Sequence, residues 1–273
     1  MKNFKTKLLQ EIEKAGKHIY RYWRLSLKYD IDFQINSVED FLKDSTKAVK
    51  WFCGTTFFAG RGDWLSDIYR RAFFITFSRI FSDDIDDIKI KEKIDLLLEN
   101  FKEEVSKIKK LSGEAYKVRG RDLEAIRNSL EFVANNLKEY NFNPVKFLKE
   151  KIEKHEVREF IEKVRIKQVG LKLKSMMIRD VVVWYNLKLT DEELRFIFPV
   201  DVWVRELCSR IWPETKNMKE KELMNYITLR LKEMKISPTY FNAGLWAIGW
   251  HGRNAVKLLL ESQIYLSRTS NEM

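Results

Sequence analysis

The chain has 273 residues, 45% of them hydrophobic and 33% charged, and its 51 Lys and Arg against 40 Asp and Glu give a formal net charge of +11. This composition excludes a disordered chain, because enough apolar surface is present to build a core. The surplus of cations suits a polyanionic partner, whereas the charge-rich surface of a thermophile would raise Lys and Glu together and leave the surplus unexplained.

The pattern of residues predicts an all-α fold. Only 10 Gly and 4 Pro interrupt segments that are rich in Lys, Glu, Ile and Leu. In chain order, helices are predicted at 3–29, 38–58, 64–81, 90–110, 121–139, 144–164 and 175–185. Another starts at Pro199-Val200-Asp201 and continues through Leu207, and further helices follow at 215–234, from Pro238 through Trp246, and past Gly252.

The turn Ile166-Lys167-Gln168-Val169-Gly170-Leu171-Lys172 lies between two of these helices. Gly170 favours a positive φ or a close backbone approach there, and Lys172 follows it by two residues. Successive backbone N–H groups around Gly170 can bind a phosphate oxygen, and Lys167 and Lys174 would add Coulombic attraction. The turn is therefore a predicted contact to a nucleic-acid backbone.

A second feature follows about thirty residues later, where Phe198-Pro199-Val200-Asp201 precedes apolar residues at helical spacing. A proline and then a carboxylate are typical of a helix start, because the carboxylate can accept hydrogen bonds from the first backbone N–H groups. The sequence therefore predicts that Asp201 lies at the N-terminus of a helix.

A Gly-x-Lys turn between two helices, followed by Pro-Val-Asp, resembles the catalytic core of the helix-hairpin-helix DNA glycosylases. Within that superfamily the chain is most similar to the archaeal 8-oxoguanine DNA glycosylase/AP lyase family. Two further patches carry the resemblance: Gly60-Arg61-Gly62-Asp63-Trp64, and Asn242-Ala243-Gly244-Leu245-Trp246. Gln168 and Asn242 depart from the family pattern, which usually has Gly at the first position and Asp at the second.

The resemblance implies two helical lobes with a cleft between them. One lobe would be a six-helix barrel over 44–185 that contains the hairpin motif, and the other would combine 1–43 with 186–273. The substrate would be double-stranded DNA with a damaged base, bound by a monomer without cofactor or metal. Some relatives hold an iron–sulfur cluster, but Cys53 and Cys208 are too few to form one.

The resemblance also implies roles for single residues. Lys172 would attack a sugar carbon and form a Schiff base, and Asp201 would stabilise the positive charge that develops on the sugar. In this register Arg179 is the basic residue seven positions on; in a second register Lys167 is the nucleophile and Lys174 takes that place. Trp246, Asn242 and Trp64 are the predicted base pocket.

Three functions remain open at this point. The first is a glycosylase that removes 8-oxoguanine and cleaves the abasic site by β-elimination. The second is a monofunctional glycosylase for another lesion, in which Asp201 acts alone, and the third is a non-catalytic helix-hairpin-helix protein that binds DNA. The chain has no run of 18 apolar residues and its first residues lack the apolar stretch of a signal peptide, so we expect a cytoplasmic, nucleoid-associated protein without a membrane partner.

Overall fold

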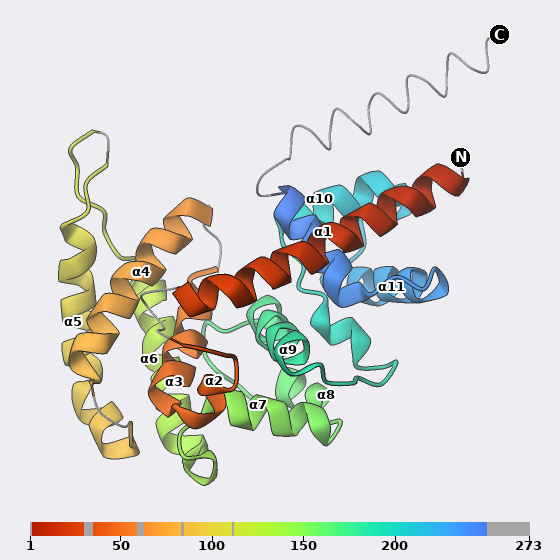
Figure 1. The fold of residues 1–273 in the computed structure, drawn as a ribbon. Helices are drawn as coiled ribbons and strands as arrows, with labels where there is room; N and C mark the ends of the chain where they lie inside the picture. The colour runs from red at the N-terminus through yellow and green to blue at the C-terminus, as the bar shows by residue number, and fades with distance from the viewer. Residues whose placement is uncertain (1, 30–34, 59–62, 83–84, 111, 250–273) are drawn as a thin grey trace. The chain divides into compact units, whose positions relative to one another are not determined.

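The structure is a computed structural model that describes residues 2–29, 35–58, 63–82, 85–110 and 112–249 (Figure 1). These residues are mostly helical and contain no β-strand beyond an isolated antiparallel bridge between Lys109 and Ala115, so the predicted all-α class is confirmed. The helix predicted past Gly252 and most of the Gly60-Arg61-Gly62-Asp63 loop lie outside the described residues. No helix within them is both long and apolar enough to cross a bilayer.

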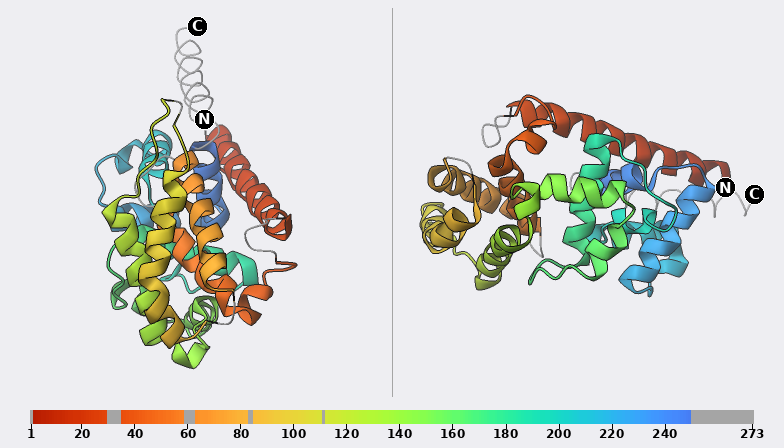
Figure 2. Two further views of the ribbon diagram at one scale, coloured as in Figure 1. Left: turned by 90° about the vertical axis from the view of Figure 1, so that its left-hand side faces the viewer. Right: turned by 90° about the horizontal axis from the view of Figure 1, so that it is seen from below.

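The elements in chain order are α1 (Lys2–Tyr29), α2 (Asp40–Lys43), α3 (Ser45–Thr55), η1 (Thr56–Phe58), α4 (Asp63–Ile80), α5 (Asp87–Ser106), α6 (Gly120–Asn136), η2 (Lys138–Tyr140), α7 (Pro144–Glu153), α8 (Val157–Glu162), α9 (Leu171–Tyr185), η3 (Leu194–Ile197), α10 (Val202–Ile211), η4 (Pro213–Thr215) and α11 (Glu220–Glu233). A further helix covers 238–249. Figure 2 shows the same elements from two other directions.

The chain forms two compact units. Unit 1 combines Met1–Trp23 with Ile197–Met273, and unit 2 is the continuous segment Arg24–Phe196. The limits of the units fall between residues 23 and 24 and between 196 and 197. The lobes expected from the resemblance have their limits between 43 and 44 and between 185 and 186. Both ends of the chain contribute to unit 1.

Aromatic side chains form much of the core of unit 2. The ring centroid of Trp184 in α9 lies 4.9 Å from that of Trp51 in α3 and 5.0 Å from that of Phe41 in α2. The rings of Trp184 and Phe41 are nearly parallel. Farther along, Phe57 and Phe73 both pack against Phe101 of α5, with ring centroids 5.5 and 5.9 Å away. Burial of rings of this size dominates the hydrophobic stabilisation of such a unit.

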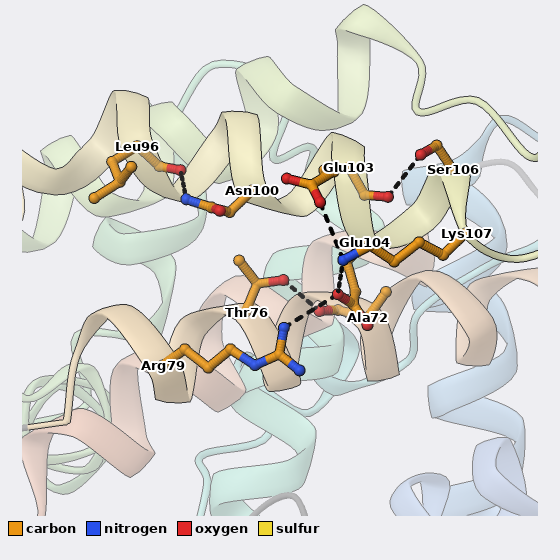
Figure 3. Close-up of polar contacts among 9 residues, drawn as sticks. All are labelled: Ala72, Thr76, Arg79, Leu96, Asn100, Glu103, Glu104, Ser106 and Lys107. Carbon is orange, nitrogen blue, oxygen red and sulfur yellow. Dashed lines mark hydrogen bonds and ion pairs between the residues drawn. The ribbon is translucent and has the colours of Figure 1, made fainter.

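A polar contact joins α4 to α5 beside this core (Figure 3). Glu104 of α5 accepts hydrogen bonds from Arg79 of α4 and from Lys107, each at 3.2 Å. Burial raises the pKa of the Glu104 carboxyl, but the hydrogen bond from Lys107 and the charge of Arg79 outweigh it, and the pKa is lowered overall.

In unit 1, α1 crosses the helix over 238–249 at very short range. A Cβ added to Gly244 would lie 1.9 Å from the carbonyl oxygen of Ile12, and one added to Gly16 would lie 1.8 Å from that of Tyr240. Any side chain at Gly16 or Gly244 would therefore force the two backbones apart.

Two helices that were predicted as continuous are interrupted. The predicted helix over 38–58 breaks at Asp44, because its carboxylate accepts a hydrogen bond from the backbone N–H of Lys47 and starts a new helix. The helix predicted over 144–164 breaks at His155, whose φ of 57° cannot continue an α-helix. The helix predicted to reach residue 110 ends at Ser106, where a short ribbon begins.

Candidate active site and DNA-binding hairpin

α8 and α9 form a helical hairpin joined by a tight turn. The N–H of Val169 donates to the carbonyl of Ile166 at 3.0 Å, and Gln168 has a φ of 68°. A positive φ at the third residue and this hydrogen bond are features of a type II turn. The left-handed position is thus Gln168, which is the position where the resembled family has glycine.

The expectation of a positive φ or a close approach at Gly170 was wrong. Gly170 is the N-cap of α9 with φ −80° and ψ −177°, and a Cβ added to it would meet no atom within 4 Å. No side chain caps the first backbone N–H groups of α9 from this residue. The turn is therefore set by Gln168, while Gly170 is an exposed N-cap of α9 that has no side chain to accept from its first N–H groups.

Lys174 fastens the two helices of the hairpin together. Its ammonium donates to the carbonyls of Ile161 at 2.9 Å and Phe160 at 3.4 Å, and also to that of Val164. Phe160 and Ile161 lie in the last turn of α8, where helix carbonyls lack intrahelical partners and favour a cation, and Val164 follows just after the helix. Burial lowers the pKa of Lys174. Because its side chain is 6% exposed, Lys174 is a structural cap and does not fit the predicted role of a phosphate contact.

Lys172 lies in the first turn of α9 and is half-buried. Met176, Met177 and Ile178 are buried, as expected for the register with Lys172 as the nucleophile. All residues from Leu173 to Arg179 are buried, so this burial fits both registers. Lys167 is more open, with 69% of its side chain exposed and its ammonium 3.6 Å from Glu124 of α6. The amide of Gln168 donates to the same carboxylate at 3.1 Å.

Arg179, the predicted basic DNA contact farther along α9, is buried. Its guanidinium donates to the carboxylate of Asp180 through two nitrogens, at 3.1 and 3.2 Å, and its side chain is 4% exposed. Breaking this pair would leave a charge inside the unit, which is strongly unfavourable. The prediction of Arg179 as a surface contact is therefore wrong, and Arg179 belongs to the interior of unit 2.

Asp201 is the N-cap of α10, as the Pro-Val-Asp pattern predicted. Its Oδ1 accepts a hydrogen bond from the N–H of Val204 at 2.8 Å, and the residue is half-buried. Val202, the next residue, is 74% exposed although it is apolar. Burial, and the charge of Asp201, raise the pKa of the Cys208 thiol beneath, so this thiol stays protonated.

Asn242 lies below the same turn and fixes it. Its side-chain amide donates to the carbonyl of Pro199 at 3.0 Å, and Asn242 is 1% exposed. A residue so enclosed has no open face for the edge of a base, so the predicted pocket role of Asn242 is replaced by a positioning role for the Pro199–Asp201 turn. Trp246, one helical turn farther on, is half-buried and keeps part of its indole at the surface.

Three further points complete the description of the predicted site. The side chain of Trp64 lies outside the described residues. Lys172 belongs to unit 2 and Asp201 belongs to unit 1, so the surroundings of each residue are described within its own unit. Among the residues that the structure describes, no three His, Cys, Asp or Glu side chains are grouped so that they could hold a metal ion.

Sequence reasoning missed the cap made by Lys174 and the bond from Asn242 to Pro199. The spacing of Lys174 behind the turn was a usable signal, since a cation that faces the end of the preceding helix can cap it. Comparisons of the chain with protein-family models, with curated proteins and with solved structures gave no match in any of the three.

Proposed function

We propose that this chain is a DNA glycosylase that excises an oxidised purine, 8-oxoguanine, and cleaves the resulting abasic site as an AP lyase. The observation that carries the proposal is the local placement of two residues. Lys172 is half-buried in the first turn of α9, just behind a left-handed hairpin turn, and Asp201 is a half-buried N-cap that follows Pro199. These are the positions that the resembled family uses for its lysine and aspartate.

The chemistry assigns one task to each residue. The amine of Lys172 attacks C1′ of the damaged nucleotide, the glycosidic bond breaks, and the base leaves with its electron pair and takes up a proton. Asp201 stabilises the positive charge that builds on the sugar in the transition state. The nitrogen then loses a proton and the sugar ring opens, which gives the Schiff base. The Schiff base acidifies the C2′ proton. Its removal breaks the C3′–O bond by β-elimination, and the 3′ phosphate leaves.

The proposal includes a finer architecture. A barrel-like lobe over 44–185 and a second lobe from both chain ends would enclose a cleft in which Lys172 and Asp201 act on one extruded nucleotide. Extrusion is needed because the reacting atoms are hidden in the stacked duplex, and it costs a few kcal/mol. The open N-terminus of α9 at Gly170 would bind a phosphate through backbone N–H groups, which supports the hairpin as the DNA contact.

Borohydride trapping tests the proposal. Purified protein would be incubated with duplexes that contain 8-oxoguanine, an abasic site or no lesion, and the Schiff base would be reduced to a covalent adduct. We expect an adduct and strand cleavage with the first two duplexes only. Base release without an adduct would instead indicate a monofunctional glycosylase, and binding without base release would indicate a non-catalytic DNA-binding protein.

A further inference from the structure

The connection between α5 and α6 carries a cluster of positive charge. Residues 107–110 and 112–121 form what we call the basic arm, which extends beyond the end of α5 in the views of Figures 1 and 2. Its cations are Lys107, Lys109, Lys110, Lys117, Arg119 and Arg121, and its one carboxylate is Glu114. This is a large share of the net charge of +11 in a short segment.

The arm has a defined backbone. The N–H of Lys110 donates to the carbonyl of Glu114 at 2.8 Å, and that of Tyr116 donates to Ile108 at 3.1 Å, around the Lys109–Ala115 bridge. Gly113 closes the turn with a φ of 81°. The two segments therefore pair as a short antiparallel ribbon.

One face of the ribbon packs against α4. Side chains alternate between the faces of an extended chain, so Lys110, Glu114 and Tyr116 share one face. On it Tyr116 packs edge to face against Tyr69 of α4, with centroids 6.4 Å apart, and Lys110 pairs with Glu114 at 2.7 Å. The hydroxyl of Tyr69 also donates to the carbonyl of Lys117 at 2.7 Å and so anchors the base of the ribbon.

The opposite face is the basic one. By the same alternation Lys109 and Lys117 lie on it together, and both are exposed. Arg121, exposed in the first turn of α6, follows directly. Within the part of the chain that the structure describes, none of these three side chains has an ion-pair partner, in contrast to Lys107, Lys110 and Arg119.

We infer that the basic arm is a second DNA contact, in which Lys109, Lys117 and Arg121 bind backbone phosphates of a duplex outside the active site. The inference rests on the proposed function, which supplies duplex DNA as the partner. Lys109 and Lys117 on the anchored ribbon and Arg121 at the start of α6 can each contact a phosphate, because no internal ion pair of theirs has to break first. The arm would add affinity and orientation, and would take no part in the chemistry.

Salt titration of DNA binding tests the arm. The triple variant Lys109→Gln, Lys117→Gln and Arg121→Gln should reduce the slope of log K against log salt by about 2.7, since each lost phosphate contact removes about 0.9. The loss of affinity relative to the unmodified protein should then be about 40-fold larger at 50 mM than at 200 mM salt.

The matched control is Lys91→Gln, Lys138→Gln and Lys188→Gln, which removes three exposed lysines of unit 2 elsewhere. It has the same net charge as the arm variant, so an equal change of slope in both variants would overturn the inference. So would an unchanged slope in the arm variant, or a preference of the unmodified protein for single-stranded RNA over duplex DNA.

The outcome is separable from that for the proposed function. Single-turnover base release at saturating protein should be the same in the arm variant and the unmodified protein, because the proposed arm contributes affinity and no group to the chemistry. If no base is released by either protein but the slope still falls, the glycosylase proposal fails and the arm stands. If trapping succeeds and the slope does not change, the arm fails alone. All substituted residues are exposed, and circular dichroism would verify that each variant is folded.

Discussion

The ammonium of Lys174, in the first turns of α9, donates a hydrogen bond to the carbonyl of Ile161 in α8 at 2.9 Å. This bond, with those to Phe160 and Val164, makes the hairpin a single cross-linked element. The turn that carries Lys172 is thereby held between two helices that cannot separate without exposing unpaired carbonyls.

We expect Lys174→Met to lower the free energy of unfolding by about 1–3 kcal/mol, because buried carbonyls at the end of α8 lose their donor while the apolar volume is kept. Urea denaturation measures this loss. Lys167→Met is the matched control, since Lys167 is 69% exposed and its replacement should change stability by no more than about 0.5 kcal/mol. Equal stability of the two variants would contradict the capping role.

Lys172→Gln should abolish borohydride trapping and β-elimination, because only an amine can form the Schiff base. Gln is polar and only one atom shorter than Lys, so folding should be preserved at this half-buried position. Lys167→Gln serves as the comparison. If trapping persists in Lys172→Gln and is lost in Lys167→Gln, the nucleophile is Lys167 and the second register is correct.

Asp201→Asn should retain DNA affinity and reduce base release by at least about 100-fold, because the carboxylate acts on charge that appears only in the transition state. Asn is as good an N-cap as Asp, so the hydrogen bond to Val204 is kept. Asp201→Ala should show the same catalytic loss and about 1 kcal/mol less stability. If Asp201→Asn retains full turnover, Asp201 acts only as a helix cap.

Trp246→Ala should weaken binding to lesion-containing duplex by about one to two decades, since stacking of a base on an aromatic ring is worth about 1–3 kcal/mol. Binding to undamaged duplex should change little. Trp212→Ala gives the contrasting case, because Trp212 is 2% exposed and its truncation should lower the melting temperature instead. A large melting shift in Trp246→Ala with unchanged lesion preference would assign Trp246 to the core.

Stability should depend on pH through Glu104. Its pKa in the folded chain is below the ordinary value of about 4.3, so the stabilisation is present above that value and is lost as the pH falls through the folded pKa. Glu104→Gln should therefore lower the urea midpoint at pH 7 and flatten its decline toward pH 3. Glu103→Gln, at a carboxylate that is 65% exposed, should leave both nearly unchanged; identical curves for the two variants would count against the Arg79–Glu104–Lys107 contact.

The sequence predicted local structure well where a residue acts on its own neighbours. Asp201 after Pro199 was expected to start a helix and does so, because an N-cap depends only on the following turn. Asp44 gives the same kind of signal, yet the apolar pattern around it predicts one continuous helix, whereas the structure has a break there. The all-α class followed from residue propensities that are summed over long segments.

Which charged side chains become buried could not be predicted. Arg179 was expected as a DNA contact from the family register and Lys174 as a phosphate contact of the hairpin, but folding buries Arg179 with its neighbour Asp180 and Lys174 against the end of α8. Asn242 was placed in a pocket from its spacing to Trp246, and only the folded chain shows that its amide is held by Pro199. The burial of Arg179 and the partner of Asn242 are decided by packing, which periodicity does not encode.

The close crossing of α1 with the helix over 238–249 determines when α1 can pack during synthesis. A chain is synthesised from its N-terminus at roughly 5–20 residues per second, so the apolar face of α1 leaves the ribosome long before Gly244 exists to receive it. All of unit 2 is translated in between and can fold first. Truncation of the nascent chain before residue 238 would leave α1 without its partner helix, and a stalled ribosome would present that face to chaperones and proteases.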